Sequence, residues 1–379
     1  MIYLDHTATM IPNKELLDYY VQCALEYPAN PASIHSAGFA AKKAQATAIN
    51  KLAEIFGCRP EELLITSGGS ESINLALKGA LAANRRLGQR ILITEGEHSA
   101  VTESAKWLAE HGYTIERIGL TTEGVIDLKQ LEQALQKPAA MLSLIYVNNE
   151  TGAVAPLDEI VGLKSRLQPE MLIHVDGVQA CGKVKWNFNK LGIDMFSGSG
   201  HKFGAPRGIG FLIHRYGIRI EPLIHGGGQQ RGLRSGTENV PLVMTMAKAA
   251  ELAVENIDQK NEYVKRLKQQ LLDRLSELGV SYMLLSPADA VPGIISIAID
   301  GLRGETLLHA LENSGIFVST GSACSSKKRE ESSVLRAMKL SEEAINGSIR
   351  ISIAKSNTIE EIDTVAEAIS QAVKWLVRR

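Results

Sequence analysis

Short runs of mostly consecutive apolar residues, separated by helical segments, limit the fold of this chain more than any other feature. The runs are five to seven residues long and comprise residues 90–94, 141–147, 171–175, 193–197 and 209–213. Apolar residues that follow one another, instead of alternating with polar ones, are typical of strands covered on both faces. The sequence therefore predicts an α/β fold in which helices wrap a mostly parallel sheet, with the chemistry at the strand ends.

Helical periodicity is clearest near the N-terminus. Along residues 36–56 apolar side chains recur at three- and four-residue spacing, and Gly57 follows where a helix would end. A second helix is predicted over residues 71–87, closed by Gly88.

The sequence changes in character after Asn239. The segments expected there are helices over 242–257 and 261–278, the strand-like runs GIISIAID, FVSTG and GSIRISIA, and a last helix from Glu360. We therefore expect a large domain over residues 15–255 and a smaller α+β domain formed by residues 1–14 together with 256–379, which would carry a mobile loop around Cys324.

The charge balance excludes some classes of ligand. The 379 residues include 41 basic and 42 acidic side chains, a formal net charge of -1, so no long-range field would attract a polyanion or an acidic membrane surface. Direct binding of nucleic acid is not expected. No run of about 18 uncharged apolar residues occurs, and the start MIYLDHTATM has no basic region followed by an apolar stretch, so neither membrane insertion nor secretion is expected.

The four cysteines lie far apart and form no Cys-x-x-Cys pair, which favours a reducing cytoplasmic compartment over a disulfide framework or a thiolate metal site. We expect no bound metal. Cys324 lies in the polar segment VSTGSACSSKKREESS, where neighbouring positive charge favours the nucleophilic thiolate form. The other three are expected to be packed as small apolar side chains: Cys23, Cys58 and Cys181.

Two polar segments directly follow expected strands. The segment SGSGHKFGAPRGIG places His201 and Lys202 in a glycine-rich turn. Lys202 could be a solvated surface lysine, but an amine tuned by desolvation at a strand end also suits covalent capture of a carbonyl cofactor. The run MLIHVDG ends in Asp176, with Gln179 close behind. A buried carboxylate needs a cationic partner, which a protonated pyridine nitrogen would supply; otherwise Asp176 begins a turn or helix.

Three further motifs allow a structural or a functional interpretation. The turn in LLITSGGSES, with Gly69 and Ser70, is either an anion site or a tight structural turn, and it lacks the glycine-lysine pattern of nucleotide loops. Arg350 in GSIRISIA would need a bidentate anion, supplied equally well by a substrate or a protein carboxylate. His98 in EGEHSAV is by default a capping or core residue, and otherwise a residue for ring stacking or proton transfer.

The motifs also form an ordered series over nearly the whole chain: YLDHTAT, NPASIH, TSGGSES, EHSAV, VNNETG, HVDGVQ, SGSGHK, GGGQQRGLRSGTEN, GSACSS and SIRIS. In this series the chain resembles the cysteine desulfurases, a group of class V, fold-type I aminotransferases that use pyridoxal phosphate.

The resemblance implies roles in binding the cofactor. Lys202 would bond to it covalently, Asp176 would pair with the pyridine nitrogen, and Gln179 would donate a hydrogen bond to the ring hydroxyl. His98 would stack on the ring and move protons. The phosphate would be held by the Gly69 turn and by the side chains of Ser70, Ser199, His201 and, from the second subunit of a homodimer, Thr237.

The resemblance also implies a reaction. Arg350, with Asn149 nearby, would bind the carboxylate of L-cysteine, and Cys324 would accept the sulfur as a persulfide while L-alanine leaves. A sulfur-acceptor protein, such as an iron–sulfur scaffold or a tRNA thiolation enzyme, would then receive the sulfur. Alternatives on the same scaffold are a selenocysteine lyase, a cysteine sulfinate desulfinase or a class V transaminase, and a non-catalytic dimeric docking protein is an alternative of another class.

Overall fold

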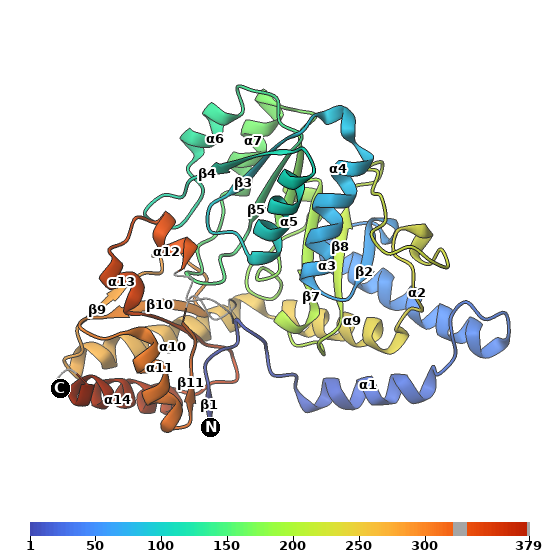
Figure 1. Cartoon of the computed structure of the whole chain (residues 1–379). Coiled ribbons are helices and arrows are strands. Elements are labelled where there is room, and N and C mark those ends of the chain that lie inside the picture. The colour runs from blue at the N-terminus through green and yellow to red at the C-terminus, as the bar shows by residue number, and fades with distance from the viewer. Residues whose placement is uncertain (321–331, 377–379) are drawn as a thin grey trace.

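A seven-stranded sheet forms the centre of the large part of the molecule in the computed structural model, which describes residues 1–320 and 332–376 (Figure 1). Its strands are β2 (Leu63–Thr66), β3 (Arg90–Thr94), β4 (Thr114–Ile118), β5 (Met141–Ile145), β6 (Leu172–Asp176), β7 (Met195–Ser199) and β8 (Gly210–His214). They lie in the order β2-β8-β7-β6-β5-β3-β4. Strand β8 is antiparallel to both neighbours, whereas β7, β6, β5, β3 and β4 pair in parallel. The mostly parallel sheet is thus confirmed.

Helices cover both faces of this sheet, as the consecutive apolar runs predict. On β3, Leu92 packs into one apolar cluster, whereas Ile91 and Ile93 pack into another, because successive side chains of a strand point to opposite faces. The first cluster includes residues of α2 (Ser36–Phe56) and α9 (Val240–Val254). The second includes residues of α3 (Gly69–Asn74) and α5 (Ser99–Glu110).

The two predicted N-terminal helices have different outcomes. Helix α2 spans Ser36–Phe56 as predicted and ends at Gly57, whose φ of 66° is the left-handed conformation that glycine adopts readily. The helix predicted over 71–87 is confirmed in part. A helical backbone runs through α3, a π-helical turn (Leu75–Gly79) and α4 (Ala80–Ala83), leaves helical geometry at Asn84, and is followed by a 3₁₀ turn (Arg85–Leu87). The π-helical turn ends at Gly79, whose carbonyl accepts a hydrogen bond from the Glu221 amide at 3.0 Å.

The C-terminal part contains a separate three-stranded antiparallel sheet in the order β12-β10-β9. Its strands are β9 (Tyr282–Leu284), β10 (Ile294–Ile299) and β12 (Ser348–Ser352), and the long helices α10 (Ile257–Glu277) and α14 (Ile359–Leu376) lie side by side against it (Figure 1). These elements confirm two of the three strand-like runs and the predicted helices to within a few residues.

The N-terminal segment lies beside this small sheet. Strand β1 (Ile2–Tyr3) pairs in parallel with β11 (Ile316–Phe317), which contains only the first residue of the run FVSTG, and Asp5 bridges to Ser352. Leu4 is buried in the apolar cluster of α10 and α14. The remaining helices are α1 (Lys14–Glu26), α6 (Leu128–Ala134), α7 (Leu157–Leu167), α8 (Phe188–Leu191), α11 (Gly304–Asn313), α12 (Ser333–Ala337) and α13 (Glu342–Asn346).

Three cysteines are unpaired in the described part of the chain. Cys23 and Cys181 are buried and Cys58 is partly buried, and Cys181 and Cys58 pack into or against the cluster of α2 and α9, as expected for small apolar side chains. Burial raises the pKa of Cys58 and of Cys181 to about 12, so both thiols stay protonated at neutral pH. Among the residues described, no helix has the length and apolar character needed to cross a membrane.

Candidate active site

A cavity of about 260 Å³ opens where β5, β6 and β7 end. Because parallel strands end at the same edge of a sheet, residues that follow separate strands come together there. All but two of the residues expected at the site line this cavity: Gly69, Ser70, His98, Asn149, Asp176, Gln179, Ser199, His201, Lys202 and Arg350. Thr237 does not line it, and Cys324 lies outside the described residues.

Lys202 lies in the 3₁₀ turn (Gly200–Lys202) that follows β7. Its Nζ donates hydrogen bonds to the carbonyl oxygens of Thr7 and Ala8, each at 2.8 Å. The amine is therefore held at the cavity by the backbone of the N-terminal segment, in one position.

Asp176 is the last residue of β6 and is only 2% exposed. One carboxylate oxygen accepts a hydrogen bond from the Val178 amide at 3.0 Å. Burial raises the pKa of Asp176, while positive charge on His98 and Lys202 acts in the opposite direction. A buried carboxylate of this kind gains stability from any further cation placed in the cavity.

His98 both caps a helix and lines the cavity. It is the N-cap residue of α5, and its Nδ1 accepts a hydrogen bond from the Ala100 amide at 3.1 Å. The default capping interpretation is therefore confirmed. Since Nδ1 acts as an acceptor, the proton of the neutral ring is on Nε2.

The start of α3 packs closely against the end of β7. A Cβ atom on Gly69 would lie 2.7 Å from Cγ2 of Val178 and 3.5 Å from Cβ of Ser199, so a side chain would not fit. His201 Nδ1 lies 3.1 Å from the hydroxyl of Thr9. Burial, followed by the positive charge of Lys202, lowers the pKa of His201 to about 4, which leaves this ring neutral at neutral pH.

Arg350 is 4% exposed and already has a carboxylate partner. Its Nη2 donates to Oδ1 of Asp5 at 2.8 Å, and its Nη1 donates to the carbonyl of Asn149 at 3.1 Å. The sequence left a protein and a substrate carboxylate as equal alternatives, and the structure supplies the protein one. Nε of Arg350 is nevertheless buried without a hydrogen-bond partner among the described residues.

The other two expected residues are Thr237 and Cys324. Thr237 is exposed on the loop before α9 and does not line the cavity. Cys324 lies outside the described residues.

The N-terminal segment is the part of the site that sequence reasoning missed. Thr7 and Ala8 line the cavity, and Gln179 Nε2 also donates to the Thr7 carbonyl, at 3.0 Å. The Thr7 hydroxyl is buried and has no hydrogen-bond partner within the described chain. The motif YLDHTAT was the available signal, but no local pattern connects it to residues more than 170 positions away.

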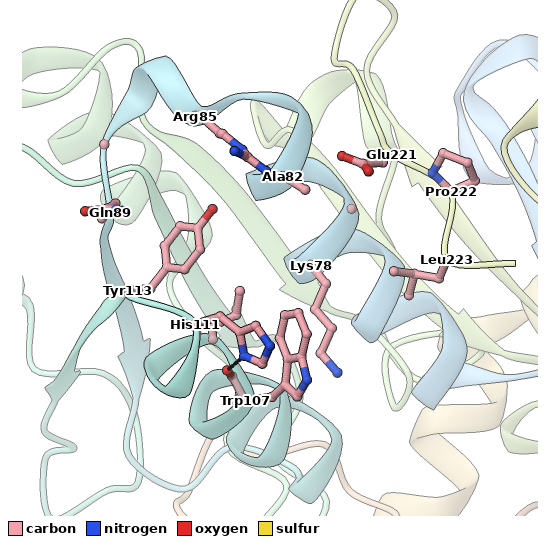
Figure 2. A pocket seen from close by; sticks show the side chains of 13 residues that line it. Lys78, Ala82, Arg85, Gln89, Trp107, His111, Tyr113, Glu221, Pro222 and Leu223 are labelled. Atoms are coloured by element: carbon pink, nitrogen blue, oxygen red, sulfur yellow. Dashed lines mark hydrogen bonds between the residues drawn. The ribbon is translucent and has the colours of Figure 1, made fainter.

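A larger cavity, of about 650 Å³, is lined in part by residues of α4 and α5 (Figure 2). None of the expected site residues that the structure describes lines it. The ring of Trp107 stacks on His111 with a centroid separation of 3.7 Å, and Nζ of Lys78 lies 4.6 Å from its centroid. The ring of Trp107 thus already contacts His111 and Lys78, and no buried carboxylate among the described residues lines this cavity. The smaller cavity, with Lys202 and Asp176, is the candidate active site.

Comparisons with known proteins identify the family of the chain. The aminotransferase class-V family matches residues 2–365. A cysteine desulfurase IscS of Methanosarcina thermophila is 36% identical over 375 residues, which cover 99% of this chain and 92% of that protein. A cysteine desulfurase 2 of Trichormus variabilis is 39% identical over 379 residues, with 99% and 94% covered.

Solved structures give the same result. A NifS-like protein superposes with a TM-score of 0.93 at 34% identity, covering 99% of both chains. A NifS-like protein from Rickettsia africae superposes with a TM-score of 0.88 at 30% identity, again covering 99% of both chains. The chain therefore belongs to the aminotransferase class-V family and, within it, to the cysteine desulfurases.

Proposed function

We propose that the chain converts L-cysteine to L-alanine with pyridoxal phosphate as its cofactor, and that Cys324 takes up the sulfur as a persulfide. The observation that supports this most directly is the meeting of the Lys202 amine, the buried Asp176 carboxylate and the Arg350 guanidinium in one cavity. The test is to supply L-cysteine to the protein loaded with pyridoxal phosphate and to measure alanine release. No alanine would refute the proposal.

The residues present fit pyridoxal phosphate. Lys202 offers an amine for the aldehyde, Asp176 a carboxylate for the ring nitrogen, and Gln179 an amide for the ring hydroxyl. Hydroxyls suited to the phosphate come from Ser70 and Ser199, beside the amides at the start of α3, and Thr237 of a second copy would complete this set in a homodimer. Thr7 also lines the cavity, and its buried hydroxyl has no hydrogen-bond partner among the described residues.

The mechanism assigns each residue one task. When bound, the cofactor supplies a protonated pyridine ring that withdraws electrons from the substrate. Arg350, which lines the cavity, orients the substrate carboxylate. The amine of Lys202 and the imidazole of His98, through its Nε2, transfer protons to and from the substrate carbons.

Sulfur transfer is a displacement at the substrate sulfur. The Cys324 thiolate attacks this atom, a sulfur–sulfur bond forms, and the carbon–sulfur bond breaks. The electron pair of the broken bond is protonated at carbon, which gives alanine. The persulfide on Cys324 then passes to a sulfur-acceptor protein, for which an iron–sulfur scaffold or a tRNA thiolation enzyme is our proposal.

We further propose a cytoplasmic location and a division into domains near residue 255. The unpaired state of Cys23, Cys58 and Cys181 fits a reducing compartment. The apolar cluster of the small sheet, which includes Leu4, is distinct from the two clusters of the large sheet, and this supports grouping the N-terminal segment with the C-terminal part.

Replacing Arg350 is expected to weaken the use of cysteine. Arg350→Ala removes a charged hydrogen bond to the substrate carboxylate, at a cost of about 1.5–3 kcal/mol, or roughly ten- to a hundred-fold in kcat/KM. The measurement is kcat/KM for alanine release, with Arg350→Lys as the matched variant that keeps the charge. A specificity constant equal to that of the wild type in Arg350→Ala would remove this residue from the substrate site.

Replacing Asp176 is expected to separate cofactor binding from turnover. Asp176→Asn keeps the size of the side chain, so the protein should retain its pyridoxal phosphate, but turnover should fall by at least about ten-fold because the ring nitrogen is no longer held protonated. The bound cofactor is measured by absorbance and turnover by alanine release. Wild-type turnover in this variant would refute the pairing with the ring nitrogen.

A further inference from the structure

Gln179, which lines the cavity, is held at both ends of its amide. Its Oε1 accepts a hydrogen bond from Nζ of Lys183 at 3.0 Å, and its Nε2 donates to the carbonyl of Thr7, also at 3.0 Å. An ammonium group can only donate, so the oxygen end must face Lys183. The donor end therefore faces Thr7 and the cavity, and Lys183 determines this orientation.

Lys183 is also connected to the candidate nucleophile by hydrogen bonds. The Thr7 carbonyl that accepts from Gln179 Nε2 accepts from Nζ of Lys202 as well, at 2.8 Å. Burial, followed by the positive charge of Lys202, lowers the pKa of Lys183 to about 8, so it is still mostly charged at neutral pH. Among the described residues, no ion pair joins Lys183 to a carboxylate. Its charge is therefore not neutralised by a direct partner.

The groups around the two lysines come from several segments. They are His6 of the N-terminal segment, Asp176 of β6, Cys181, His201 of the turn after β7, and Arg207. Two carboxylates belong to this group of charges: Asp176, whose pKa is raised by burial while the charge of Lys202 acts to lower it, and Asp5, which acts on His6. Burial lowers the pKa of His6 and His201, and the charge of Lys183 contributes in the same direction to both, so these rings add no cation at neutral pH.

We infer that Lys183 is a positioning residue of the cofactor site, which orients the Gln179 amide and, as a second positive charge beside Lys202, favours the neutral amine there. This inference rests on the proposed function. Only a neutral amine has the lone pair that Lys202 would need to hold an aldehyde cofactor covalently. The backbone of Lys183 also has a structural contact, because its carbonyl accepts a hydrogen bond from Asn261 Nδ2 at 2.8 Å. Substitution of the Lys183 side chain keeps this backbone contact.

The charge effect is tested with the apoprotein. The rate at which it captures added pyridoxal phosphate is followed by absorbance across a range of pH, and the attachment point is identified by borohydride reduction and peptide mapping. In Lys183→Met the midpoint of the rate profile should rise by about one pH unit, so capture near neutral pH should be about ten-fold slower. Lys183→Arg should keep the wild-type midpoint.

The orientation effect is tested by the absorption maximum of the bound cofactor. Lys183→Met should shift this maximum in the wild-type background, but not in a Gln179→Ala background, where no amide remains to be oriented. An equal shift in both backgrounds would overturn this part of the inference. Lys183→Gln serves as a second neutral variant if circular dichroism shows that Lys183→Met is unfolded.

The outcomes separate this inference from the proposed function. A wild-type protein that captures no aldehyde at Lys202 would refute the proposed function, and the inference with it. If the wild type, Lys183→Met and Lys183→Gln all capture the aldehyde with the same midpoint of the pH–rate profile, the role of the Lys183 charge is refuted. The proposed function is then unaffected.

Discussion

Lys202→Ala is expected to lose covalent attachment of pyridoxal phosphate and to slow alanine release by roughly 10³-fold or more, because one side chain provides both attachment and proton transfer, and proton transfer alone contributes about 10²- to 10⁴-fold. The loss should not result from unfolding. Lys202 lines the cavity and donates two hydrogen bonds to backbone carbonyls. The alanine variant leaves the sheet and its apolar clusters unchanged.

The matched control is Lys78→Ala in the larger cavity. Lys78 is a partly buried lysine that contacts Trp107 and takes no part in the proposed reaction, so this variant should release alanine at the wild-type rate (Figure 2). Circular dichroism and thermal unfolding of both variants check the fold. Substantial alanine release by folded Lys202→Ala would contradict the assignment of the nucleophile.

Cys324→Ala is expected to have a comparable effect on sulfur transfer. The protein should still bind pyridoxal phosphate and cysteine, since the residues proposed to hold them, such as Lys202, Asp176 and Arg350, are unchanged, but alanine release should fall by roughly 10³-fold as a positioned nucleophile is lost. Mass spectrometry after brief exposure to cysteine should find one extra sulfur atom on the Cys324 peptide of the wild type and none in the variant.

Cys58→Ala is the control for this experiment. The raised pKa of the Cys58 thiol makes it a poor nucleophile, so removing it should leave the extra sulfur on Cys324. Full alanine release by Cys324→Ala would instead favour a selenocysteine lyase or a sulfinate desulfinase. A protein that stays colourless with added pyridoxal phosphate would favour a non-catalytic docking protein.

The strand ends explain why so much of the site was predictable. Asp176 and Lys202 follow two separate apolar runs, and a parallel sheet brings the ends of such runs to one edge. Local chemistry also specified α2, because the glycine after its last turn marks the end in the sequence. These features depend on neighbours within a few residues.

Contacts between distant segments could not be predicted in this way. Lys202 donates to carbonyls 195 and 194 residues away, and Arg350 pairs with Asp5 across 345 residues. Backbone acceptors carry no side-chain signature, so Thr7 and Ala8 gave no sign of their role. The π-helical turn within the predicted helix 71–87 likewise contacts a distant segment, since the carbonyl of its last residue, Gly79, accepts from the amide of Glu221.

Borohydride reduction of the protein loaded with pyridoxal phosphate tests the central claim most directly, because it fixes the cofactor to whichever amine holds it. Peptide mapping by mass spectrometry then identifies that amine. The account predicts a pyridoxyl group on Lys202 and none on Lys183. A modified lysine elsewhere, or no modified lysine at all, would contradict it.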